Sequence, residues 1–232
     1  MVNPDNTTLG KGLLFAVVLL GISSFCGAQS AGWGLWSGVL LRDVRPDSRF
    51  DYSGEYQVRL TDDLKTLKSH FFEVSGYYKA NAKLESNFGY RFTIRPDRNE
   101  SRLFAGLFYR TTLVKPNPKS GKFGLRLTQQ LMYQRDLNAS FNDVLLDSNT
   151  VRYALYLTKP FTPVWHGLVI GGAMYTWNAE YSGVEKLRAA IGVRLRRRNN
   201  DGILMLLVRE RRNQPNSTVT STVVWLRYEA VF

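Results

Sequence analysis

Cysteine and histidine are scarce in this sequence, whose 232 residues include one cysteine, Cys26, and two histidines, His70 and His166. A single cysteine cannot form an intramolecular disulfide, and so few thiol and imidazole groups make no zinc-binding cluster. Glycine-rich phosphate-binding loops of the Walker type are absent as well. The sequence therefore predicts no metal ion, no cofactor and no catalytic cluster.

Long apolar runs are equally scarce, which excludes a bundle of membrane helices, because each such helix needs about 20 consecutive apolar residues. The one candidate stretch, residues 13–22, follows a lysine and precedes small residues that end at Ala28. This order is typical of a secretory signal peptide over residues 1–28, with a cut after Ser30 or a buried N-terminal helix as alternatives. Cleavage would leave residues 29–232 as one exported barrel domain without cysteine.

Acidic residues are the minority, since 31 Lys and Arg against 19 Asp and Glu give a net charge of +12. Such an excess suits a nucleic acid, an anionic lipid surface or a positively charged channel. The basic residues are spread mostly one at a time along the chain, and the main block, residues 194–198, lacks regular interleaved aromatic residues. We therefore expect no nucleic-acid partner.

Alternation of apolar and polar side chains is what the sequence has in place of long apolar runs. In "FGYRFTIR", residues 88–95, Phe88 and Tyr90 point to one face of an extended chain and Arg91 points to the other. This pattern predicts a series of strands separated by turn-forming residues. The candidate strands span residues 33–42, 49–60, 66–78, 83–95, 102–113, 122–134, 150–159, 167–178, 185–196, 202–211 and 219–232.

The number of candidate strands is odd, whereas single-chain bacterial outer-membrane barrels have an even number of antiparallel strands. The first candidate would run the wrong way to close against the last. Either the first segment is not a full strand, which gives ten, or one strand is missing from the count, which gives twelve. Twelve is favoured slightly, because Trp33, Trp36, Val39 and Leu41 look suited to lipid contact. The predicted fold is all-β, a transmembrane antiparallel up-and-down barrel of 10–12 strands.

The carboxyl-terminal segment "STVVWLRYEAVF" resembles the last strand of bacterial outer-membrane proteins. This resemblance implies that Tyr228 and Phe232 belong to a signal read by the barrel-assembly machinery. Strands of about ten residues also match the ~25 Å apolar band of an outer-membrane barrel. We therefore expect the bacterial outer membrane as the location, with its lipid and lipopolysaccharide as partners.

Two further segments carry a resemblance to a known family: "WSGVLLRDVRPDSRFDYSGEYQVRLTDDL" and "FEVSGYYKANAKLESNFGYRF". Their order of tryptophan, short turn, "ExQxRL" and "GYRF" resembles a family of small uncharacterised bacterial outer-membrane β-barrels, labelled only as a domain of unknown function. The resemblance implies a barrel and implies no known activity.

The polar faces of the predicted strands would line the lumen of such a barrel. If the lumen is open, the excess of arginine over acids would favour anions, whereas pairing of arginine with glutamate would make a closed plug. A third use of the basic residues is binding of lipopolysaccharide phosphates at the rim by Arg98, Arg102, Arg211 and Arg212. The predicted lumen-lining residues are Glu55, Arg59, Glu73, Glu85, Arg91, Arg126, Arg152, Arg188, Arg194, Arg227 and Glu229.

The function that fits these observations is a small integral outer-membrane barrel, either structural or a narrow, anion-preferring channel. One alternative is an outer-membrane lipid hydrolase or acyltransferase that uses His70 or His166. Adjacent Ser69 and His70 point to opposite faces of a strand, however, which disfavours a catalytic pair. The other alternative is a soluble periplasmic β-barrel that binds a ligand.

Overall fold

The computed structural model describes residues 29–45, 47–61, 63–117, 123–139, 147–178, 182–196, 201–214 and 217–232. The predicted signal peptide, residues 1–28, lies outside the described residues. The regular elements of the described part are the strands β1 (Gln29–Asp43), β2 (Phe50–Thr61), β3 (Thr66–Lys79), β4 (Leu84–Ile94), β5 (Asn99–Val114), β6 (Leu125–Ala139), β7 (Ser148–Pro160), β8 (Trp165–Trp177), β9 (Ser182–Arg196), β10 (Gly202–Gln214) and β11 (Ser217–Val231). A search of the same residues found no helix long and apolar enough to cross a membrane.

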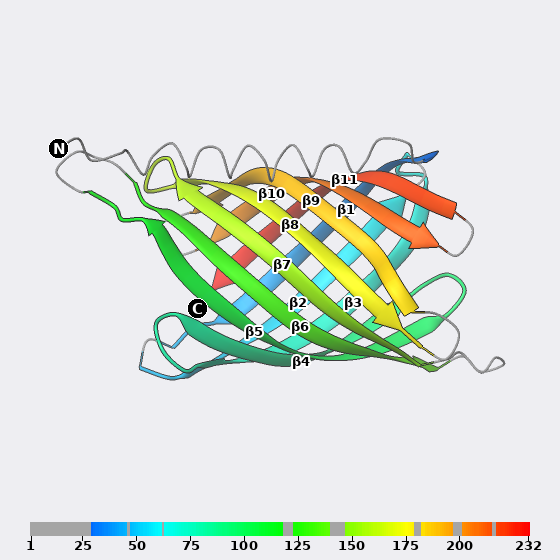
Figure 1. Cartoon of the computed structure of the whole chain (residues 1–232), viewed down its shortest axis with the longest axis horizontal. Coiled ribbons are helices and arrows are strands. Elements are labelled where there is room, and N and C mark those ends of the chain that lie inside the picture. The colour runs from blue at the N-terminus through cyan, green and yellow to red at the C-terminus, as the bar shows by residue number, and fades with distance from the viewer. Residues whose placement is uncertain are drawn as a thin grey trace, which may run out of the picture.

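The strands form one closed barrel, in which each strand from β1 to β11 pairs with the next one along the chain (Figure 1). These sequential pairs are antiparallel, as short connections require. The prediction of an all-β barrel is confirmed. Each of the predicted segments corresponds to one strand, with boundaries that differ by a few residues.

The barrel closes through a parallel pair, β1 with β11, and therefore has an odd number of strands. The pairing runs from Gln29 opposite Val219 to Arg42 opposite Val231. This closure leaves no open sheet edge. Its free-energy cost is small, because a parallel ladder is only slightly less stable per residue than an antiparallel one. The prediction that the count must be ten or twelve, with every pair antiparallel, was wrong, because it excluded parallel closure.

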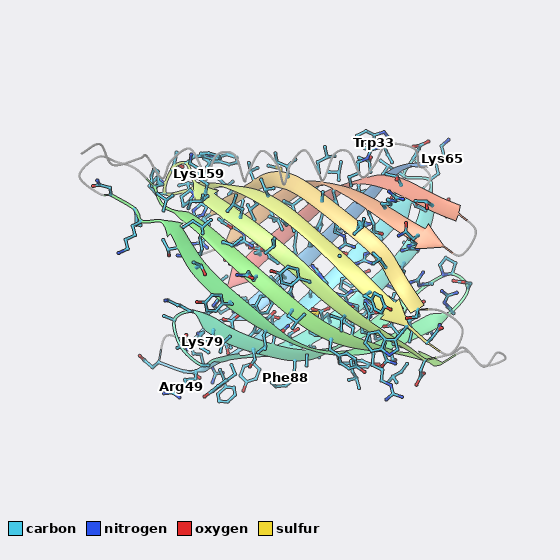
Figure 2. All side chains as sticks on the ribbon, in the orientation of Figure 1. Trp33, Arg49, Lys65, Lys79, Phe88 and Lys159 are labelled. Atoms are coloured by element: carbon cyan, nitrogen blue, oxygen red, sulfur yellow. The ribbon has the colours of Figure 1, made fainter. Side chains whose placement is uncertain are left out.

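The two faces of each strand differ sharply in exposure. Phe88, Tyr90 and other large apolar side chains on alternate positions point outward, and Phe88 is 57% exposed (Figure 2). The intervening residues point into the barrel, where Arg91 is part-buried. Trp36 is 4% exposed and belongs to the interior, so its expected lipid contact was wrong, whereas Trp33 is 54% exposed. An odd spacing of three residues puts these two tryptophans on opposite faces.

The interior also contains an apolar cluster that the sequence analysis did not predict. Both faces of β10 are apolar over "ILMLLV", residues 203–208, so its inner-facing side chains pack inside the barrel as its outer-facing ones stay exposed. The buried members of the cluster are Trp36, Leu168, Ile170, Ala190, Leu204, Leu206, Val208 and Val223.

The strand directions define two rims. We call the end at which β1 and β11 finish the C-terminal rim; it holds the connections that follow β1, β3, β5, β7 and β9 (Figure 1). The end at which β1 and β11 begin, with the connections that follow β2, β4, β6, β8 and β10, is the N-terminal rim. Arg98 lies in the turn before β5, and Arg102, Arg211 and Arg212 lie near strand ends of this same N-terminal rim.

Candidate functional site in the barrel interior

The predicted lumen-lining residues occupy inner-facing positions on seven of the strands. Side chains two residues apart on a strand point to the same face. Each of these residues shares its face with residues that are buried in the barrel. They are Glu55 and Arg59 of β2, Glu73 of β3, Glu85 and Arg91 of β4, Arg126 of β6, Arg152 of β7, Arg188 and Arg194 of β9, and Arg227 and Glu229 of β11.

One ion-pair network joins β2, β9 and β11. Arg227 contacts Glu55 at 3.3 Å and Glu229 at 2.6 Å. Glu229 also accepts a hydrogen bond from Arg194 at 3.2 Å. Because β1 separates β2 from β11 in the barrel, the Arg227–Glu55 pair passes across the inner surface of an intervening strand. Two arginines and two glutamates thus neutralise one another.

A second group surrounds the buried ring of Phe71. Arg91 donates a hydrogen bond to Glu73 at 2.7 Å, and its guanidinium lies 4.1 Å from the centre of the Phe71 ring. Arg59 lies between two rings, 4.9 Å from Phe71 and 4.7 Å from Trp36. Arg59 also donates to the Gln57 side chain at 2.8 Å. Cation–π contacts of this kind stabilise a cation where water is excluded.

The third group lies toward the C-terminal rim and includes a carboxylate that the predicted set omitted. Asp51 is 1% exposed and contacts Lys79 at 2.6 Å and Arg42 at 3.2 Å. Arg42 also lies 3.8 Å from Glu85, which contacts Arg110 at 3.0 Å. The Arg42–Glu85 contact joins β1 to β4, which are not neighbours in the barrel. Asp51 has the same strand parity as Glu55, and this signal could have identified it.

The fourth group lies toward the N-terminal rim. Arg188 pairs with Glu210, which also lies 3.7 Å from Arg212. Arg102 pairs with Asp136. Neither Glu210 nor Asp136 was in the predicted set, although each has the parity of a buried residue on its own strand, Val208 and Gln134 respectively. Arg102 and Arg212, which were expected to bind lipopolysaccharide phosphates at the rim, contact interior carboxylates instead.

Three of the predicted arginines have no carboxylate of a described residue within ion-pair distance. They are Arg59, Arg126 and Arg152. Arg152 donates to the Tyr156 hydroxyl at 2.9 Å, and that hydroxyl donates to Gln130 at 2.7 Å. Arg126 is exposed near the start of β6, at the C-terminal rim. The interior as a whole therefore keeps an excess of positive charge.

The two histidines lie far from any arrangement that resembles a hydrolase site. His70 is on the outer face of β3, with its ring 6.1 Å from Tyr56 and 6.4 Å from Phe72, and its Nδ1 has no hydrogen-bond partner among the described residues. Ser69 is buried on the inner face. His166 lies within β8, opposite Arg194, one residue before the start of the predicted strand 167–178. No group of histidine and acidic residues in the described part of the chain could hold a metal ion.

The residues of the predicted assembly signal lie on the C-terminal rim. The Tyr228 hydroxyl donates to Asp201 at 2.9 Å. Phe232 is 74% exposed, while its backbone N–H donates to the carbonyl of Arg42 at 2.9 Å. The last residues of the chain are thus held to β1 by backbone hydrogen bonds and leave the Phe232 ring accessible.

Comparison with known proteins gives one match. A family model described as "Protein of unknown function (DUF2490)" matches residues 33–221. This range begins inside β1 and ends inside β11, so it includes the nine strands between them. It contains the interior ion-pair groups apart from Arg227 and Glu229, which lie in the part of β11 beyond residue 221. No curated protein matches the sequence.

Proposed function

The chain belongs to the DUF2490 family of proteins of unknown function, and we propose that it is an integral outer-membrane β-barrel whose interior is closed, with a structural rather than an open-channel role. The observation that carries the proposal is the distribution of side chains between the two faces of the barrel, which is the reverse of that in a soluble protein. Apolar side chains cover the outside, and charged side chains are paired inside.

The outer face supports contact with lipid. Large apolar side chains are exposed on every strand. Soluble monomers rarely expose a contiguous apolar patch of more than a few hundred Å². Aromatic residues gather toward both rims, as in the interfacial girdles of outer-membrane barrels. Phe50 and Tyr78 lie 5.1 Å apart near the C-terminal rim, and Tyr133 and Tyr175 flank Trp177 near the N-terminal rim. A soluble periplasmic barrel would place this apolar face in water.

The inner face supports closure. Contacts join strands that are not neighbours: Arg42 reaches Glu85 across two strands, and Arg188 of β9 lies 5.0 Å from the Trp36 ring of β1. Such contacts require side chains to meet inside the barrel. Together with the apolar cluster around Leu206, they occupy space that a general pore would leave to water.

The experiment is single-channel recording on residues 29–232, refolded in detergent and inserted into planar bilayers. Heat-modifiable gel mobility first establishes that the barrel has folded. The closed-barrel proposal predicts a folded protein that produces no conductance steps. Frequent, long-lived openings by the folded protein would contradict closure, and recovery of the protein without detergent would contradict membrane insertion.

A narrow anion-preferring channel is the second candidate. It is favoured by the three arginines that have no carboxylate of a described residue within ion-pair distance. Arg59 and Arg152 lie in the interior and Arg126 lies at the C-terminal rim, so a positive field extends along the inner wall. This candidate predicts anion-selective steps whose size falls in Arg126→Glu. The enzyme alternative has no comparable support, since His70 faces outward among aromatic rings.

Outer-membrane lipid and lipopolysaccharide are the partners that we propose, with the barrel-assembly machinery during biogenesis. Of the four rim arginines, Arg102 and Arg212 contact interior carboxylates. We therefore test headgroup contact at Arg98 and Arg211. Arg98 itself contacts Asp97 at 3.1 Å and Glu100 at 2.9 Å. Loss of lipopolysaccharide binding in Arg98→Gln with Arg211→Gln, measured on the refolded barrel, would support this contact, and unchanged binding would contradict it.

A further inference from the structure

We propose that the barrel interior holds a small monovalent anion of the chloride type, in a cavity beneath β7, β8 and β9. Three cationic side chains line this cavity, Arg152, Lys186 and Arg188, and no carboxylate is among its described lining residues. The proposal concerns a binding site and holds whether the barrel conducts or stays closed.

The cavity follows from the strand register. One cross-strand row contains Arg152, Met174 and Lys186, and the next row on the same inner face contains Ala154, Gly172 and Arg188. Ala154 and Gly172 carry little or no side chain, so they leave a hollow between the cations. Gly172 itself has no room for a side chain, because an added Cβ would lie 2.9 Å from the carbonyl oxygen of Tyr153.

The charges around the cavity do not balance. Lys186 contacts Glu185 at 2.6 Å, and Arg188 pairs with Glu210. Arg152 has only the neutral Tyr156 hydroxyl as a described partner and makes one hydrogen bond to it, although a guanidinium offers five N–H donors. The three cations thus contact two carboxylates. A buried charge without a counter-ion is strongly destabilising, and one bound monovalent anion would neutralise the difference.

The size and lining of the cavity favour a small ion over a phosphate or a carboxylic acid. The space accommodates about one water-sized body. Apolar side chains of Ala154, Ile170 and Met174 form the rest of its wall. A chloride ion is somewhat larger than water, so the flexible Arg152 and Lys186 side chains would shift outward slightly to admit it, whereas a multiply charged oxoanion would need more room and more donors than the cavity offers.

The first test measures unfolding of the full chain refolded into zwitterionic lipid vesicles. Chloride replaces gluconate at constant ionic strength, and denaturant unfolding is followed by tryptophan fluorescence. Above the dissociation constant, each tenfold rise in free chloride should lower the apparent unfolding equilibrium constant by about tenfold. Arg152→Gln should abolish this dependence. Arg126→Gln is the matched control and should keep the dependence. Arg126 is also an inner-face arginine without a carboxylate partner among the described residues, but it does not line the cavity.

The second test needs no variant and covers the case in which Arg152→Gln does not fold. Crystals of the unaltered protein soaked in bromide should show an anomalous peak between Arg152, Lys186 and Arg188. Chloride-independent stability together with no bromide peak in the cavity would overturn the proposal in favour of a bound water. A bromide peak without any chloride dependence of stability would mean binding at crystal concentration only, and would overturn it as well.

Discussion

The free-energy cost of an arginine on the outer face of β5 should depend on how deep in the membrane that arginine lies. Leu107 and Leu113 lie at positions of the same parity on this one strand, with almost equal exposure of 49% and 50%. Leu107 is near the middle of the strand, whereas Leu113 is next to its last residue, at the C-terminal rim. Leu107→Arg and Leu113→Arg are therefore the same chemical change at two depths.

The two variants should differ in stability because the bilayer is apolar at its midplane and hydrated near its interface. Arginine on the lipid face of a barrel costs about 2–4 kcal/mol at the membrane midplane and about 0–1 kcal/mol near the interface. Leu107→Arg should therefore lower the free energy of unfolding by about 2 kcal/mol more than Leu113→Arg does, or about 30-fold in the equilibrium constant. In a soluble barrel both leucines would face water, and both changes would stay within about 0.5 kcal/mol of zero.

The assay is reversible denaturant unfolding of both variants and the unaltered barrel in lipid vesicles. Heat-modifiable mobility of each sample shows beforehand that a barrel has formed. Equal unfolding free energies for the two variants would refute the placement of this face in lipid, since exposure and chemistry are matched and only depth differs. A larger cost at Leu113 would show that the apolar band is centred elsewhere on the strand.

The remaining predictions concern the interior and use the same unfolding measurement. Glu73→Gln should destabilise the barrel by about 3 kcal/mol, because Arg91 keeps an unpaired interior charge, and adding Arg91→Gln should recover most of the loss; additive losses would show that the pair does not interact. Leu206→Ala should cost about 2–5 kcal/mol by leaving a cavity in the apolar cluster, and a cost below about 1 kcal/mol would show that this interior is wet. Gly89→Ala should cost about 1–3 kcal/mol, because an added Cβ would overlap an interior phenylalanine ring and backbone of the neighbouring strand, whereas Gly54→Ala, with open space at its Cβ, should cost far less.

The strands and their two faces could be predicted from local pattern. Tyr90 and Arg91 are adjacent in sequence, and extended geometry alone sends one outward and the other into the barrel. The same parity identifies inner positions throughout the chain. Trp36 shows the limit of treating a segment by composition, because it was grouped with lipid-facing residues although its parity differs from that of Trp33.

Pairings inside the barrel could not be predicted in this way. Glu55 meets Arg227 only because β1 and β11 close the barrel in parallel, which places residues from opposite ends of the chain one strand apart. Asp136 and Glu210 lie directly opposite Arg102 and Arg188 on neighbouring antiparallel strands, and they were missed because the register of these pairs was not assigned from the sequence. The register between strands depends on the whole barrel and leaves no mark in any single segment.

Local alternation alone was enough for an all-β barrel with apolar and charged faces, since the direction of a strand side chain depends on its own backbone and its nearest neighbours. The three-dimensional closure decided the strand count and the parallel β1–β11 pair. These features arise where strands distant in sequence meet, and the free energy of such contacts depends on geometry that only the folded barrel creates.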